Sequence, residues 1–197
     1  MARLPYVEPE QAPPEVREAL EALPPLNIFR TLAHAETSLR PALRLGQSIL
    51  TMQQLDARLR ELAILRVARL TGAEYEWVQH VAIGVAVGVT DEQIAALKRG
   101  DAEAACFDER ERLVLRMTTE VIEDRGTSEA TLAAARDAFS PREVVELIVA
   151  AGYYQLLAAG AGAASVSGTA RARAAAAVAR GAIFTAVSGR EATAPRR

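Results

Sequence analysis

The segment from Leu55 to Gly88 constrains the fold more strongly than any other part of the chain. Its sequence, LDARLRELAILRVARLTGAEYEWVQHVAIGVAVG, contains two runs of apolar residues at helical spacing. The triplet Thr71-Gly72-Ala73 separates the two runs. This pattern predicts two helices that are joined by a short turn and pack as an antiparallel pair.

Three ionisable residues, Glu61, Glu76 and His80, lie inside these apolar runs. Glu76 and His80 are four positions apart and therefore share one face of the second helix. At a rise of ~1.5 Å per residue, Glu61 and His80 both lie roughly 12–15 Å from the turn, so they could meet in an antiparallel pair. A carboxylate beside an imidazole fixes the tautomer of the ring, which can then exchange a proton near neutral pH.

The stretch RELAILRVARLTGAEYEWVQHVAIGVAVGVTDEQI, residues 60–94, resembles the carboxymuconolactone decarboxylase family, which includes the alkylhydroperoxidase D-like proteins. The glutamate, the E-Y-E-W motif and the histidine recur in order and at the right spacing. Further segments at 23–34, 108–117 and 140–157 extend the resemblance to about residues 23–164. The resemblance implies an all-α fold with about eight helices around a central antiparallel pair. It also implies a homo-oligomer, commonly a trimer or hexamer.

The chain departs from the peroxidase branch of this family at one motif. The Cys-x-x-Cys of that branch falls on Ala73 and Glu76 here, whereas Glu61 and His80 match its proton-relay residues. Without paired thiols there is no dithiol that could reduce a peroxide and be recycled through a disulfide. The sequence therefore resembles a longer family member that lacks thiol peroxidase chemistry.

What remains is a proton-transfer site, and the resemblance implies a cofactor-independent lyase that decarboxylates a small unsaturated lactone or keto acid. His80 would be the general acid/base, Glu61 would orient it, and Glu76 would be a further acid/base or a substrate contact. Two neighbouring carboxylates would also leave one of them as a neutral acid. Alternatives are an isomerase, dehydratase or hydrolase with the same pair, or a non-catalytic oligomeric scaffold.

Three further residues are candidates for substrate binding. The Tyr75 hydroxyl needs a partner and could wall a pocket, Arg30 could anchor a substrate carboxylate, and His34 is the second imidazole of the chain. Each has a structural alternative: packing for Tyr75, a surface ion pair for Arg30 and a capping or packing role for His34. Glu76 and His80 could likewise be a solvated pair.

The pairing of Glu61 also has a simpler alternative, an ion pair with Arg58 three residues earlier on the same helix face. A metal site built from the two glutamates and His80 is not expected, because the chain has only two histidines and no further clustered ligand. The sequence therefore predicts neither a metal nor another cofactor.

Composition limits the remaining classes. The single Cys106 excludes an intrachain disulfide, and the net charge of −2 gives no indication of a nucleic-acid partner. No signal peptide and no run of 18 apolar residues is present, so we expect a cytoplasmic protein without membrane contact.

The expected organisation is an N-terminal arm with a short helix at 1–22, the family-like domain at 23–164 and an Ala/Arg-rich tail at 165–197. Helix starts are predicted at the capping residues Asp56, Thr90, Asp108, Ser128 and Ser140. A helix is also possible at Arg171–Arg180 in the tail.

Overall fold

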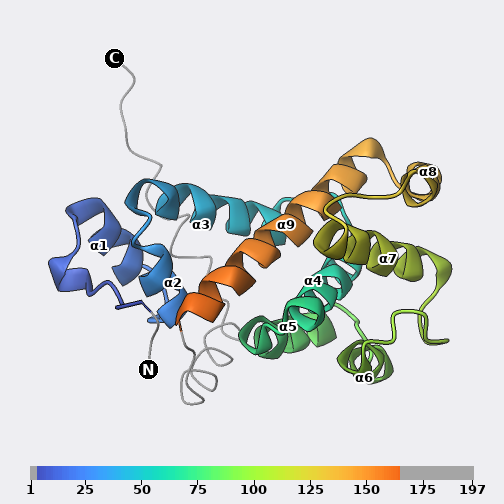
Figure 1. The fold of residues 1–197 in the computed structure, drawn as a ribbon, viewed down its shortest axis with the longest axis horizontal. Coiled ribbons are helices and arrows are strands. Elements are labelled where there is room, and N and C mark those ends of the chain that lie inside the picture. Colours follow the sequence, from blue (N-terminus) through green and yellow to red (C-terminus); the bar gives the residue numbers. More distant parts are fainter. Residues whose placement is uncertain (1–3, 165–197) are drawn as a thin grey trace. The chain divides into compact units, whose positions relative to one another are not determined.

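The structure is a computed structural model of the 197-residue chain, and it describes residues 4–164. The described residues form nine α-helices and one short 3-10 helix and contain no strand (Figure 1). The predicted all-α class is therefore confirmed, with one helix more than the eight or so expected. The helices are η1 Pro9–Gln11, α1 Pro14–Glu21, α2 Asn27–Leu32, α3 Glu36–Thr51, α4 Ala57–Thr71, α5 Glu74–Ala86, α6 Asp91–Arg99, α7 Glu109–Glu123, α8 Glu129–Ala138 and α9 Pro141–Ala164. The helix considered at Arg171–Arg180 lies outside the described residues.

The chain divides into two compact units, Met1–Ser48 with Gly160–Arg197 and Ile49–Ala159. The predicted limits at 22/23 and 164/165 stay a prediction. In the first unit, η1, α1, α2 and the start of α3 enclose a small apolar core. Its buried members are Ala12, Val16, Ala19, Leu20, Leu23, Ala33, Leu39 and Leu43. Close packing also occurs at Gly160, where an added Cβ would lie 3.1 Å from Ile28 Cδ1.

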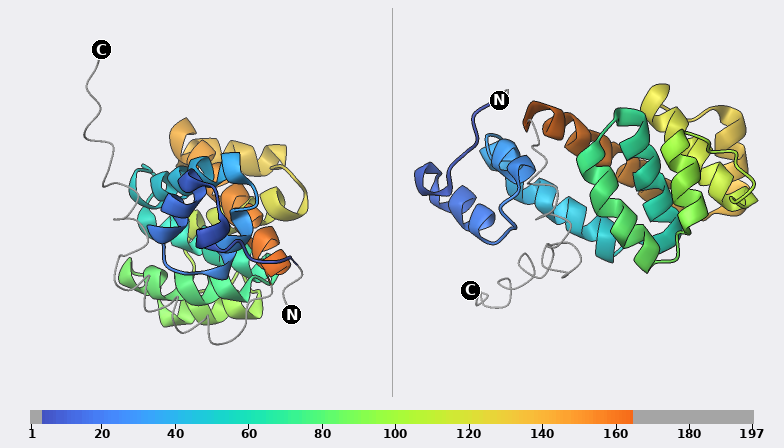
Figure 2. Two further views of the ribbon diagram at one scale, coloured as in Figure 1. Left: turned by 90° about the vertical axis from the view of Figure 1, so that its left-hand side faces the viewer. Right: turned by 90° about the horizontal axis from the view of Figure 1, so that it is seen from below.

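The second unit is built around the predicted hairpin of α4 and α5. The Asp56 side chain accepts hydrogen bonds from the backbone N–H groups of Arg58 and Leu59, at 3.0 and 3.1 Å, and so caps the start of α4. The helix ends at Gly72, which has a left-handed φ of 66°, and α5 begins two residues later. The two helices lie side by side, as predicted (Figure 2).

Helix α4 is the centre of the second unit because it is covered on several faces. It packs against α5, α6 and α7, and Leu62 and Leu65 are completely buried in that core. A further cluster joins Ile64 and Val67 of α4 to Tyr153 and Tyr154 of α9. Because so much of α4 faces other helices, the residues between these apolar positions are also removed from water.

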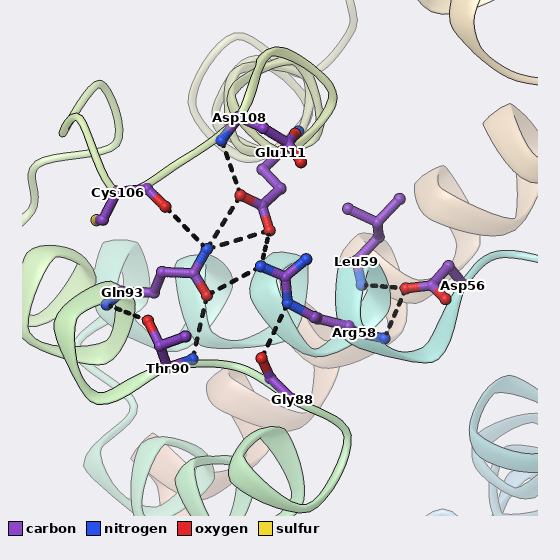
Figure 3. A network of polar contacts seen from close by, with 9 residues as sticks. All are labelled: Asp56, Arg58, Leu59, Gly88, Thr90, Gln93, Cys106, Asp108 and Glu111. Atoms are coloured by element: carbon purple, nitrogen blue, oxygen red, sulfur yellow. Dashed lines mark hydrogen bonds and ion pairs between the residues drawn. The ribbon is translucent and has the colours of Figure 1, made fainter.

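A polar network joins the starts of α6 and α7 to α4 (Figure 3). Each of these two helices begins with a capping box, formed by Thr90 with Gln93 and by Asp108 with Glu111. Gln93 Nε2 donates to both carboxylate oxygens of Glu111, at 3.1 and 3.0 Å. Arg58 forms an ion pair with Glu111 and donates through Nε to the Gly88 carbonyl at 3.0 Å. The alternative that paired Arg58 with Glu61 is therefore wrong.

Helix α9 is the longest helix among the described residues and continues past Ala159 to Ala164. Over Pro141–Ala161 it is the one helix among residues 4–164 that is long and apolar enough to cross a membrane, a test that core helices of soluble proteins also pass. Its apolar residues divide between two faces. Ala150, Ala151, Tyr153 and Tyr154 join the core, whereas Val145, Ile148, Val149 and Leu156 are exposed and are called the α9 stripe below.

Candidate functional site

The structure brings Glu61 of α4 and His80 of α5 into direct contact. Nδ1 of His80 lies 2.7 Å from Oε2 of Glu61. The glutamate is completely buried and the histidine is 5% exposed, so the contact is shielded from water. A hydrogen bond in such surroundings is stronger than the same bond in solvent. The predicted proximity of the two side chains is thus observed, and their catalytic role stays a prediction.

This contact determines which ring nitrogen can act on another molecule. With Nδ1–H donated to Glu61, Nε2 is left to accept or donate a proton, and it makes no hydrogen bond within the described residues. The ring of Tyr154 lies edge-on to the imidazole, with centroids 4.7 Å apart. Contacts from α4 and α9 together hold the imidazole in one orientation.

Glu76 lies one helical turn before His80 on α5 and is only 4% exposed. Neither of its carboxylate oxygens has a hydrogen-bond partner in the described part of the chain. Burial raises the pKa of Glu76, and the opposing influences of its own backbone N–H and of His80 are smaller. The prediction of a neutral acid thus gains support, but its cause is burial rather than repulsion by a second carboxylate.

Arg60 is a buried charged residue that the sequence analysis missed. It is 6% exposed, and its Nε donates to Oε1 of Glu61 at 3.4 Å. Its position directly before Glu61 within an apolar run was the available signal. An arginine there was overlooked because adjacent helix residues usually point in different directions.

Three tyrosines are relevant to the site: Tyr154 contacts His80, Tyr153 contacts Tyr154, and Tyr75, the one that was predicted, is influenced by Glu76. Tyr75 is partly buried, and burial, together with Glu76, raises its pKa. Burial also raises the pKa of Tyr153 to about 12, and it raises that of Tyr154 further. All three hydroxyls are therefore protonated at neutral pH and are available as hydrogen-bond donors.

Arg30 and His34 belong to the first compact unit, where both bind the N-terminal arm. Arg30 forms an ion pair with Glu8, donates to the Val7 carbonyl at 3.3 Å and stacks over Tyr6. His34 Nε2 lies 2.8 Å from the Pro5 carbonyl. These contacts agree with the structural alternatives for both residues, and their assignment to substrate binding stays a prediction.

Two observations concern metal and thiol chemistry. Within residues 4–164, no group of three or more His, Cys, Asp or Glu side chains is arranged to hold a metal ion. Cys106 is a partly buried free thiol in the segment before α7. Burial raises its pKa, and the nearby Glu92, Asp101 and Glu111 raise it further. This thiol is therefore a weak nucleophile.

The fold and the site define an all-helical protein in which a central helix pair holds a buried Glu–His contact. Residues 38–120 match the carboxymuconolactone decarboxylase family. The structure resembles the alkylhydroperoxidase AhpD core of an uncharacterized peroxidase-related protein from Ralstonia eutropha JMP134. That likeness has a TM-score of 0.70 at 18% identity and covers 88% of this chain and 96% of the other. The structure therefore has the alkylhydroperoxidase D-like fold, and residues 38–120 of the chain are similar to the carboxymuconolactone decarboxylase family.

A second solved structure supports the same fold. It is an uncharacterized peroxidase-related protein from Silicibacter sp. TM1040, with a TM-score of 0.61 and 18% identity over 72% of this chain and 75% of the other. No curated protein matches the sequence.

Proposed function

We propose that this protein is a cofactor-independent enzyme in which Glu61 and His80 transfer protons, and more specifically a lyase that decarboxylates a small unsaturated lactone or keto acid. One observation supports this proposal most directly. The 2.7 Å contact between Nδ1 of His80 and Glu61 is buried and leaves Nε2 without a partner among residues 4–164. An imidazole held in this way is suited to donate a proton at a defined atom.

The proposed reaction is a decarboxylation followed by protonation of the same carbon. The bond between the substrate carbon and its carboxylate breaks, carbon dioxide leaves, and the electron pair moves into the conjugated carbonyl to give an enolate. Protonated His80 then donates its Nε2 proton to the carbon, and a proton from solvent restores the imidazolium. Glu61 balances the charge of the imidazolium, and Glu76 donates a hydrogen bond to the carbonyl oxygen where negative charge develops.

The same pair would serve an isomerase, dehydratase or hydrolase, and these remain the alternatives. A thiol peroxidase has less support, although both similar structures carry peroxidase-related names. The two positions of the dithiol motif hold Ala73 and Glu76, and the raised pKa of Cys106 disfavours a reactive thiolate.

A substrate panel with two variants tests the proposal. Unsaturated lactone carboxylates and keto acids are supplied in deuterated water, and both carbon dioxide release and deuterium at the product carbon are measured. We expect His80→Gln to lose about 10²–10⁴-fold in rate, and Glu61→Gln to lose a smaller factor. Glu74→Gln, at an exposed glutamate of α5, serves as the control and should keep full activity. Deuterium exchange without carbon dioxide release would instead favour an isomerase, and inactivity toward every substrate would favour a scaffold.

We also propose that the protein is a cytoplasmic homo-oligomer, a trimer or hexamer, that acts on a small molecule without nucleic acid or a membrane. The α9 stripe supports a second copy as its partner. Its four apolar side chains are spaced along one helix face, with the exposed Gly152 among them. Val149→Glu should lower the molar mass measured by light scattering. Met52→Glu, at an apolar residue that is 70% exposed, is the control and should leave it unchanged.

A further inference from the structure

Most of the Arg60 side chain is buried, and its guanidinium has few protein partners. Its Nε donates to Glu61 at 3.4 Å, and its two terminal nitrogens make no hydrogen bond within residues 4–164. An arginine presents five N–H donors in a planar fork that fits a carboxylate through two parallel hydrogen bonds. The terminal nitrogens are not among the fully buried polar atoms that lack a partner, so they remain accessible to an acceptor beside the Glu61–His80 pair.

Glu76 differs from Arg60 because its polar atoms are fully buried. Both of its oxygens are enclosed and lack partners, although buried polar groups in folded proteins are nearly always hydrogen-bonded. Its four-residue spacing from His80 places the two side chains on one face of α5. A bound molecule that reaches Nε2 of His80 would thus also pass the Glu76 carboxyl group.

Tyr154 lies near both Arg60 and Glu76. Burial raises the pKa of its hydroxyl most, Glu61 and Glu76 raise it further, and Arg60 lowers it. The hydroxyl thus lies within electrostatic reach of Arg60, Glu61 and Glu76 together. Its ring also contacts the imidazole of His80. Arg60 and Glu76 therefore border the same acid/base pair.

We propose that Arg60 binds a carboxylate of the ligand at this site and that the Glu76 carboxyl group donates a hydrogen bond to a neighbouring carbonyl oxygen. The ligand class is a small lactone or oxo acid that carries at least one carboxylate. The inference takes the location of the site from the proposed function but does not depend on the reaction. The assignment also explains how a site with two glutamates could accept an anionic ligand. With Glu76 neutral, Arg60 offsets Glu61, and an anionic ligand meets no excess of negative charge.

Calorimetric titration with an unreactive probe pair tests this assignment. The probes are γ-butyrolactone-γ-carboxylate and its methyl ester, in which a methyl group replaces the negative charge. The wild-type protein should bind the carboxylate at least about tenfold more tightly than the ester. Arg60→Gln should weaken carboxylate binding about 30-fold or more and leave ester binding unchanged. Arg60→Lys, which keeps the charge without the fork, should give an intermediate loss.

Two further variants control the experiment. Arg69→Gln removes an exposed arginine from the same helix and should not alter binding. Glu76→Gln keeps a neutral donor and should retain affinity within about threefold, whereas Glu76→Ala should lose about tenfold. Circular dichroism establishes that each variant is folded. Equal affinity for the two probes, no binding of either probe, or unchanged carboxylate binding by folded Arg60→Gln would overturn the assignment.

This binding experiment can succeed where the proposed reaction fails. If no substrate is decarboxylated but binding of the carboxylate probe still depends on Arg60, the assignment of Arg60 is supported and the lyase proposal is wrong. If wild type and Arg60→Gln release carbon dioxide with the same KM, the lyase proposal is supported and the assignment of Arg60 as the carboxylate-binding residue is wrong.

Discussion

Tyr154 and His80 meet edge to face, with ring centroids 4.7 Å apart and an angle of 87° between their planes. This is the geometry that aromatic pairs prefer, and it contributes about 0.5–1.5 kcal/mol beyond the buried area. Tyr153 repeats the arrangement against Tyr154, at 5.5 Å. Helix α9 thus supports the imidazole through the ring of Tyr154, which Tyr153 supports in turn, while α4 supplies the carboxylate that binds Nδ1.

The first prediction concerns this ring contact. Tyr154→Phe keeps the ring and removes a buried hydroxyl that has no hydrogen bond among the described residues, so the free energy of unfolding should change by less than about 1 kcal/mol. Tyr154→Leu loses the edge-to-face contact and leaves unfilled space, and should cost about 2–4 kcal/mol. Urea denaturation measures both values. An equal loss in the two variants would show that the hydroxyl, rather than the ring, supports the site.

The second prediction uses the raised pKa of Glu76, which results from burial. The folded protein keeps this proton at pH values where the unfolded chain has released it. The contribution of the protonated Glu76 side chain to stability is therefore complete below the ordinary pKa of glutamate. It is lost as the pH rises through the higher pKa of the folded protein. Glu76→Gln should become progressively more stable than wild type between mildly acidic and neutral pH.

Thermal denaturation of both proteins across that pH range provides the measurement. Glu74→Gln is the matched control, because Glu74 is an exposed glutamate two positions earlier on the same helix. Its stability difference from wild type should stay constant with pH. A constant difference for Glu76→Gln as well would mean that Glu76 is ionised in the folded protein and that its neutral role is wrong.

The third prediction concerns the network of Glu111, Gln93 and Arg58 (Figure 3). Glu111 is 1% exposed, accepts from Gln93 and from the Asp108 backbone N–H, and pairs with Arg58. Glu111→Ala leaves all three donors without this acceptor and should cost about 3–5 kcal/mol, as for other broken buried ion pairs. Glu109→Ala, two positions earlier and exposed, should change the free energy of unfolding by less than about 1 kcal/mol.

Urea denaturation and a double-mutant cycle with Arg58→Ala test the network. The two residues should show a coupling energy of about 0.5–3 kcal/mol, because they touch and share partners. Additive effects would show that Arg58 and Glu111 act independently, and the proposed joining of α4 to α7 would then fail.

The sequence predicted those parts of the fold that depend on local chemistry. Asp56, Thr90 and Asp108 cap helices because their side chains bind backbone N–H groups only two or three residues away. The meeting of Glu61 with His80 was also predictable, since a short turn fixes the relative depth of residues on two adjacent helices.

Contacts between distant segments were beyond the same reasoning. Tyr154 reaches His80 from a helix 74 residues further along the chain, and no local pattern specifies that approach. Arg58 was assigned to the nearest carboxylate on its own helix, whereas tertiary packing gives it Glu111. Arg60 was overlooked because a helical period alone does not show that α4 is covered on several faces.

The turn after α7 gives the last prediction. The left-handed residue in this turn is Arg125, with φ of 62°, and not the neighbouring Gly126. At the ends of α4 and α6, Gly72 and Gly100 occupy the corresponding conformation. A side chain at such a backbone angle costs roughly 1–2 kcal/mol, part of which is offset by the greater freedom of glycine in the unfolded chain. Arg125→Gly should therefore raise the free energy of unfolding by about 0.5–1 kcal/mol in urea denaturation. Asp124→Gly, whose φ of −97° suits any residue, should lower it by a similar amount, and stabilisation by both variants would show that backbone strain at Arg125 is not the cause.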